Sequence, residues 1–169
     1  STFFFMDEGA DSGDLLSQKS VPIRWTDDAR DLYDRLLRGA EEQVSAFTPQ
    51  LAERKHERHP QNDDRANYWR KRSYDDGEVD WRMSSTIIYN LIRALARPYP
   101  GAHCMEDGEE VKLWTADVID DEFEDVQHLE PGKVLSSDPD RIAVKCGKGV
   151  VALQEHEFER ILEAGDYLQ

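Results

Sequence analysis

Residues 140–158, DRIAVKCGKGVVALQEHEF, place two apolar runs on either side of a Gly-Lys-Gly turn. β-Branched residues are frequent in both runs, so the stretch predicts two adjacent strands joined by a tight turn. Two earlier runs, EEVKLWTADVI (109–119) and GKVLSS (132–137), have the same character and are separated by Glu-Pro-Gly and Asp-Pro-Asp turns. Short strands at this spacing predict a small β-barrel-like domain.

Helical patterns flank these strands. In SSTIIYNLIRALARPYPGA (84–102), Ser84 or Ser85 is expected to cap a helix that ends before the Pro-rich segment. Its apolar face is expected to comprise Ile87, Ile88, Leu91, Ile92 and Leu95. A last helix is expected over about residues 157–164.

Residues 25–53 carry the strongest helix signal upstream, with apolar residues at helical spacing and Pro49 expected to kink or restart the helix. Two strands are expected before it, an apolar run at residues 2–5 and a second strand at 15–23. Residues 54–72 lose the periodicity and gain charge, which indicates a loop or linker.

The composition describes a globular chain. Of 169 residues, 38% are hydrophobic and 34% are charged, enough for one modest core or two small ones. The sequence has no run long enough to span a membrane and no signal-peptide pattern, so a cytoplasmic protein is expected. Cys104 and Cys146 lack metal-ligand spacing and are expected to be buried reduced thiols.

The formal net charge is −15, and only residues 54–72 are basic, with seven Lys and Arg against three Asp and Glu. Residues 100–169 have six basic and eighteen acidic residues, a net charge of −12. Because nucleic-acid binders normally present a basic face, a nucleic-acid partner is disfavoured.

The opening loop, MDEGADSGD (6–14), gathers four carboxylates and two glycines between the first two expected strands. From composition alone it is an acidic turn or a cation site, but it lacks the regular ligand spacing of a calcium loop. His56 and His59 are three residues apart, but no further candidate metal ligands accompany them at a regular spacing. No metal site is predicted.

Six motifs in order resemble the C-terminal part of the formyltransferases that use 10-formyltetrahydrofolate, a family that includes methionyl-tRNA formyltransferase and the sugar N-formyltransferases. They are MDEGADSGDLLSQKSVPI (6–23), RKRSYDDGEVDW (70–81), IYNLIRALARPYPGA (88–102), LWTADV (113–118), PGKVLS (131–136) and IAVKCGKGVVAL (142–153).

This resemblance implies an α/β architecture. Residues 1–62 would be the C-terminal portion of a Rossmann-like catalytic domain, and residues 63–169 a small OB-like domain with a packed helix. In the family, an N-terminal half supplies a catalytic Asn and His in an Asn-x-His-Pro motif, which this sequence lacks. The chain alone is therefore expected to be inactive and to need that half as a partner.

The resemblance also implies site residues. Asp11 falls on the family's catalytic Asp, which orients and supports the His that accepts the amine's proton. The loop around it is implied to line the folate pocket, with Asp7, Glu8, Gly9, Ala10 and Gly13 as binding residues for 10-formyltetrahydrofolate.

Arg70, Lys71 and Arg72 are candidates for gripping a substrate phosphate, although a basic hinge over an acidic neighbour is the simpler explanation of them. Two features favour a nucleotide-linked amino sugar as the amine substrate: the acidic C-terminal region, and the sequence of residues 70–102, which is more similar to the sugar enzymes than to the tRNA enzymes. Methionyl-tRNA formyltransferase and a non-catalytic interaction module stay open as alternatives, and a homodimer is possible.

Overall fold

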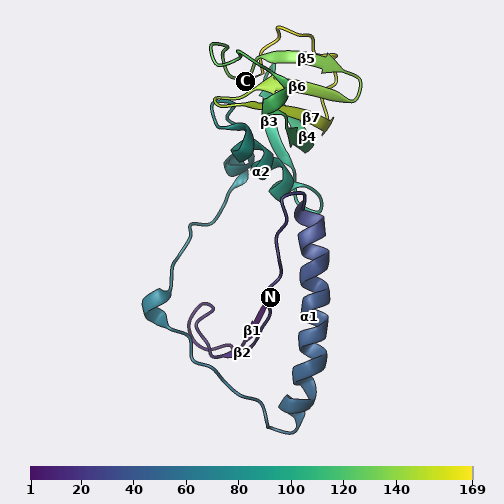
Figure 1. Ribbon diagram of the computed structural model, residues 1–169. Coiled ribbons are helices and arrows are strands. Elements are labelled where there is room, and N and C mark those ends of the chain that lie inside the picture. The colour runs from purple at the N-terminus through teal and green to yellow at the C-terminus, as the bar shows by residue number, and fades with distance from the viewer. Residues whose placement is uncertain (169) are drawn as a thin grey trace. The chain divides into compact units, whose positions relative to one another are not determined.

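The computed structural model describes residues 1–168 and divides the chain into two compact units (Figure 1). The first comprises residues 1–27 and 31–71, and the second comprises residues 28–30 and 72 onward. This division falls later in the chain than the boundary expected after residue 62.

In the first unit, β1 (Thr2–Phe4) and β2 (Leu15–Gln18) form an antiparallel hairpin, with Thr2 opposite Gln18. The hairpin packs on α1 (Ala29–Ala52) through the rings of Phe3 and Phe47, whose centroids lie 5.1 Å apart. The side-chain amide of Gln43 on α1 also donates to Ser17 Oγ at 2.8 Å.

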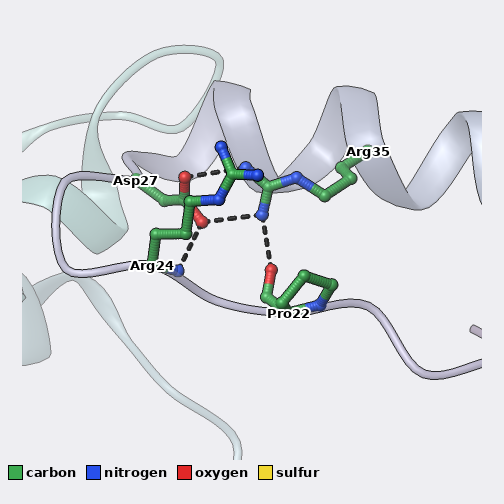
Figure 2. A network of polar contacts seen from close by, with 4 residues as sticks. All are labelled: Pro22, Arg24, Asp27 and Arg35. Carbon is green, nitrogen blue, oxygen red and sulfur yellow. Dashed lines mark hydrogen bonds and ion pairs between the residues drawn. The ribbon is translucent and has the colours of Figure 1, made fainter.

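The second strand ends earlier than expected, at Gln18 instead of residue 23. Pro22 has no N–H to donate to a ladder. Its carbonyl accepts a hydrogen bond from Arg35 on α1 (Figure 2). The pairing of β2 with β1 ends earlier, at the hydrogen bond from the Lys19 N–H to the Ser1 carbonyl at 2.9 Å.

The start of α1 is fixed by Asp27, which is buried. Arg35 donates to both of its carboxylate oxygens at 2.7 Å, and the backbone N–H of Arg24 donates to one of them at 2.6 Å (Figure 2). These hydrogen bonds hold the pKa of the Asp27 carboxyl well below its usual range. The carboxylate therefore stays ionised where the chain enters the helix.

The helix does not restart at Pro49, as one of the two expectations had it, because α1 runs on to Ala52. Pro49 lies in the last turn, so the carbonyl that loses its helical donor belongs to Ser45, which is exposed and open to water.

The second unit is built on a five-stranded antiparallel sheet with the strand order β3-β4-β7-β6-β5 (Figure 1). The strands are β3 (Ala102–Glu106), β4 (Glu109–Val118), β5 (Val134–Asp138), β6 (Arg141–Lys145) and β7 (Val150–His156). The sheet and the two helices confirm the α/β class. Four of the strands lie in the runs predicted from the sequence.

Strand β3 was missed. It is short and follows a Pro-Gly stop, but it pairs along its whole length with β4 through a two-residue turn. Asp107 and Gly108 in that turn have φ angles of 52° and 86°, the left-handed pair that a tight hairpin requires.

Helix α2 (Ser85–Leu95) has Ser84 as its cap, as predicted, with the hydroxyl accepting from the Ile87 N–H at 3.4 Å. Ile88 and Ile92 are buried in the main core of this unit, whereas Ile87 is exposed. Trp81 and both cysteines are buried, and the cysteines are free thiols as expected.

The helix expected over residues 157–164 is absent from the second unit as far as it is described, to residue 168. The backbone of the residues that follow bonds to the start of β5: the Val134 N–H donates to the Asp166 carbonyl at 2.8 Å, and the Leu168 N–H donates to the Gly132 carbonyl at 2.9 Å. Pairing with a neighbouring strand overrides the local helix propensity.

Short 3₁₀ turns complete the structure: η1 (Asp63–Arg65) in the first unit, and η2 (Tyr74–Gly77) and η3 (Asp120–Glu122) in the second. None of the helices among residues 1–168 is long and apolar enough to cross a membrane.

Candidate functional site

The acidic loop connects the two strands of the first unit and is closed at its base by a hydrogen bond from the Phe5 N–H to the Asp14 carbonyl, at 2.9 Å. Gly13 lies against this closure. A Cβ at this position would come within 1.7 Å of the Phe5 carbonyl oxygen, so only glycine fits without a backbone shift. The chain must therefore pass Phe5 closely before it enters β2.

Asp11 adopts a left-handed backbone conformation, with φ of 59°. Among non-glycine residues, Asp and Asn tolerate this region best. Asp11 is exposed, and within residues 1–168 its carboxylate makes no hydrogen bond or ion pair. The carboxylate is therefore available to a partner from outside the loop.

Two other carboxylates of the loop have partners. Asp7 Oδ1 accepts from the Gly9 N–H at 3.0 Å and from Ser12 Oγ at 2.9 Å, which makes Asp7 a brace within the loop. Asp14 lies 3.7 Å from Arg58 in an ion pair between partly exposed side chains. Glu8 is exposed and, like Asp11, has no side-chain partner among residues 1–168. Asp11 thus differs from Asp7 and Asp14 in having no partner, and from Glu8 in lying in the lining of the hollow described below.

A distant segment completes the site. His59 and Leu15 exchange backbone hydrogen bonds of 2.8 and 3.0 Å, which aligns the segment with the base of the loop. Two residues further on, Gln61 Nε2 donates to the carbonyl oxygens of Asp11 at 2.8 Å and of Gly13 at 2.7 Å.

Loop and segment border an open hollow of about 730 Å³ within the first unit. Ala10, Asp11 and Ser12 line it from the loop, and residues 60–63 and 65–69 line most of the remainder. Tyr68 and Trp69 on that segment are 90% and 83% exposed, so two aromatic rings are presented at the hollow with little cover. This volume falls within the range usual for small-molecule sites.

Of the residues predicted to bind folate, Ala10 lies in the lining of this hollow, as does Asp11. Asp7, Glu8, Gly9 and Gly13 belong to the same loop but are outside the lining. Sequence reasoning did not single out Gln61, Tyr68 or Trp69, because their segment was interpreted as a charged linker.

The three basic candidates are not gathered in one hollow. Arg70 and Lys71 belong to the first unit, and Arg72 to the second. Arg72 pairs loosely with Asp76 at 3.8 Å and lines a separate hollow of about 620 Å³ beside Tyr74. Their proposed grip on phosphate stays a prediction.

Among residues 1–168, no group of three or more His, Cys, Asp or Glu side chains is arranged to hold an ion.

Comparisons with known proteins place the chain in a family. Residues 71–169 match the family model described as "Formyl transferase, C-terminal domain". A methionyl-tRNA formyltransferase from Caldanaerobacter subterraneus subsp. tengcongensis is 35% identical over 158 residues, covering 94% of this chain and 49% of the relative. This chain therefore spans about half the length of that relative.

Two solved structures share the fold. A variant of HypX from Aquifex aeolicus superimposes with a TM-score of 0.70 at 21% identity, covering 94% of this chain and 27% of HypX. The N-formyltransferase from Helicobacter canadensis, solved with folinic acid and dTDP-3-aminofucose, has a TM-score of 0.67 at 19% identity, covering 90% of this chain and 54% of that enzyme.

Proposed function

Because this chain belongs to the formyl transferase family, we propose that, joined to the N-terminal half its relatives have, it transfers a formyl group from 10-formyltetrahydrofolate to the primary amine of a nucleotide-linked amino sugar. The observation that carries the proposal is the Asp11 loop: of its four acidic residues, Asp11 is the one that lies in the lining of a hollow of about 730 Å³, and its carboxylate has no partner among residues 1–168. A cytoplasmic location and a homodimer stay predictions.

In this proposal residues 1–62 complete a Rossmann-like catalytic domain, and residues 63–169 form an OB-like domain. As its nitrogen bonds to the formyl carbon, the amine loses a proton to a histidine that the N-terminal half supplies. The bond from the formyl carbon to folate N10 then breaks, and N10 takes up that proton as tetrahydrofolate leaves. The Asp11 carboxylate orients that histidine and favours its protonated form, because an opposite charge nearby raises the pKa of an imidazole.

The folate co-substrate supplies the one-carbon group. The hollow is large enough for a ring system, and the residues around it offer backbone and amide groups together with the aromatic rings of Tyr68 and Trp69. Ala10 and Asp11 would contact the co-substrate directly, whereas Asp7, Glu8, Gly9 and Gly13 would shape the loop that holds it.

Charge favours a nucleotide sugar over tRNA as the source of the amine. A tRNA is held by many phosphate contacts, and residues 100–169, with a net charge of −12, would oppose them. A nucleotide sugar needs only a few hydrogen-bond donors in one pocket. Arg70, Lys71 and Arg72 are the proposed phosphate contacts.

A second candidate function is methionyl-tRNA formylation. It is favoured by the relative with 35% identity, which is a methionyl-tRNA formyltransferase. A third, a non-catalytic interaction module, would apply to a chain that acts without the N-terminal half.

The test is a competition assay. The full-length protein is expressed from the coding sequence of this chain together with the native sequence directly upstream. It is incubated with 10-formyltetrahydrofolate, amino-sugar nucleotides and methionyl initiator tRNA at two salt concentrations. We expect formylation of an amino-sugar nucleotide. Efficient formylation of the tRNA that weakens steeply with salt would favour the second candidate, and no formylation of either would favour the third.

A further inference from the structure

Gln61 lies outside the motifs that carry the family resemblance, yet its side chain joins both ends of the Asp11–Gly13 stretch. We infer that Gln61 is a positioning residue: its side-chain amide holds the loop in the backbone conformation that presents the Asp11 carboxylate to the hollow. The inference rests on the proposed function only for the catalytic role of Asp11. That the Gln61 amide holds the loop in place does not depend on the proposed function.

The geometry is specific to an amide. An –NH₂ group carries two hydrogens, and Gln61 Nε2 lies 2.8 Å from the Asp11 carbonyl oxygen and 2.7 Å from the Gly13 carbonyl oxygen. A carboxylate of the same length has no hydrogen to offer and would repel both carbonyl oxygens. A hydroxyl has only one hydrogen.

The loop needs such a support. Asp11 has a φ of 59°, a region that a non-glycine residue keeps only when its surroundings hold it there. The Asp7 brace fixes the loop between residues 7 and 12, and the bond from Phe5 to Asp14 fixes its base. Among residues 1–168, the Gln61 amide is the group whose bonds reach the Asp11 and Gly13 carbonyls.

Gln61 is itself held in place. The paired backbone bonds between His59 and Leu15 set the register of its segment, and Pro60 restricts the backbone between them. The amide therefore reaches the loop from an anchored backbone, about fifty residues further along the chain.

The structural test uses Gln61→Met in the 169-residue chain, since methionine keeps the length and loses the donor. Gln50→Met is the matched control, because the Gln50 amide also donates to a backbone carbonyl, that of Ala46 on α1, at 3.4 Å. By NMR, we expect the carbonyl-carbon shifts of Asp11 and Gly13 to move in Gln61→Met and to stay in place in the control. Unchanged shifts in Gln61→Met would overturn the inference.

The functional test uses the full-length protein. We expect Gln61→Met to lower kcat by on the order of 10- to 100-fold, as a small misplacement of a reacting group does, with KM for the amine changed less than about threefold. Gln61→Glu is expected to lower kcat further than Gln61→Met does.

The decisive readout is a double-mutant cycle with Asp11→Asn. If Gln61 acts through Asp11, the double variant is no slower than Asp11→Asn alone. Losses that multiply would show that Gln61 acts independently and would refute the positioning role. If the wild-type protein formylates no amine, the proposed function fails, while the carbonyl shifts still decide whether Gln61 holds the loop.

Discussion

Arg35 and Asp27 form a two-pronged ion pair in which both terminal nitrogens of the guanidinium donate to the carboxylate, each at 2.7 Å. The pair links the second turn of α1 to the residues just before the helix, and Arg35 also donates to the Pro22 carbonyl (Figure 2). One arginine therefore fixes both the start of α1 and the direction in which the chain enters it.

We expect Asp27→Asn to destabilise the first unit in a pH-dependent way. The folded-state pKa of Asp27 is lowered by hydrogen bonds from Arg35, so its contribution is fully present above the unfolded pKa of about 4 and is lost as the pH falls through the lower folded-state value. The melting temperature of the wild type should exceed that of Asp27→Asn at pH 7, and the difference should shrink below about pH 4.

Thermal unfolding followed by circular dichroism at several pH values measures this difference. Asp34→Asn is the matched control, because Asp34 is an exposed carboxylate on the same helix. A gap between wild type and Asp27→Asn that is constant from pH 7 to about pH 2 would contradict the assignment.

Leu153 lies on β7 in the main core of the second unit and is fully buried. Leu153→Ala removes buried methyl groups and leaves a cavity, which should lower the free energy of unfolding by about 2–5 kcal/mol. Urea unfolding of the second unit, followed by circular dichroism, measures the loss. Ile161→Ala, at a side chain that is 88% exposed, should change the value by less than about 0.5 kcal/mol, and equal losses would refute the core assignment.

Cys104 and Cys146 should be inert in the native protein. Burial raises the pKa of each thiol to about 12, so at pH 8 only about one molecule in ten thousand carries the reactive thiolate. Iodoacetamide should label neither cysteine within an hour under native conditions and both in urea, as read by mass spectrometry. Rapid native labelling of either one would show that its part of the sheet opens.

Local patterns predicted much of the second unit. The cap at Ser84, the buried pair Ile88 and Ile92, and four of the five strands follow from propensity and spacing within a few residues. What failed depends on partners distant in sequence. Strand β3 was missed because its stability comes from pairing with β4, and residues 157–164 are not helical because the chain that follows bonds to the start of β5.

The candidate site divides in the same way. The loop and Asp11 were found through a resemblance carried by contiguous residues. Gln61 was not, because its role depends on a bridge between His59 and Leu15 that no local pattern reveals. The same holds for Tyr68 and Trp69. Their segment has the sequence character of a charged linker, and only the structure shows that it lines the hollow.

The remaining prediction concerns the proposed catalytic carboxylate. Asp11→Asn is the informative change, because asparagine also tolerates the left-handed φ of 59° and so removes the charge without straining the loop. In the full-length protein we expect turnover to fall by about 10²-fold or more, as for other carboxylates that orient a histidine, with folate affinity and melting temperature retained.

Asp14→Asn serves as the comparison, since Asp14 lies in the same loop but pairs with Arg58 at 3.7 Å and is outside the lining of the hollow. Its exposed ion pair is weak, so the change should cost little stability and less than about threefold in turnover. Steady-state kinetics of both variants, measured with the amine substrate found by competition, separate the two carboxylates. A larger loss from Asp14→Asn would transfer the catalytic role to Asp14, and near-normal turnover in both would remove it from this loop.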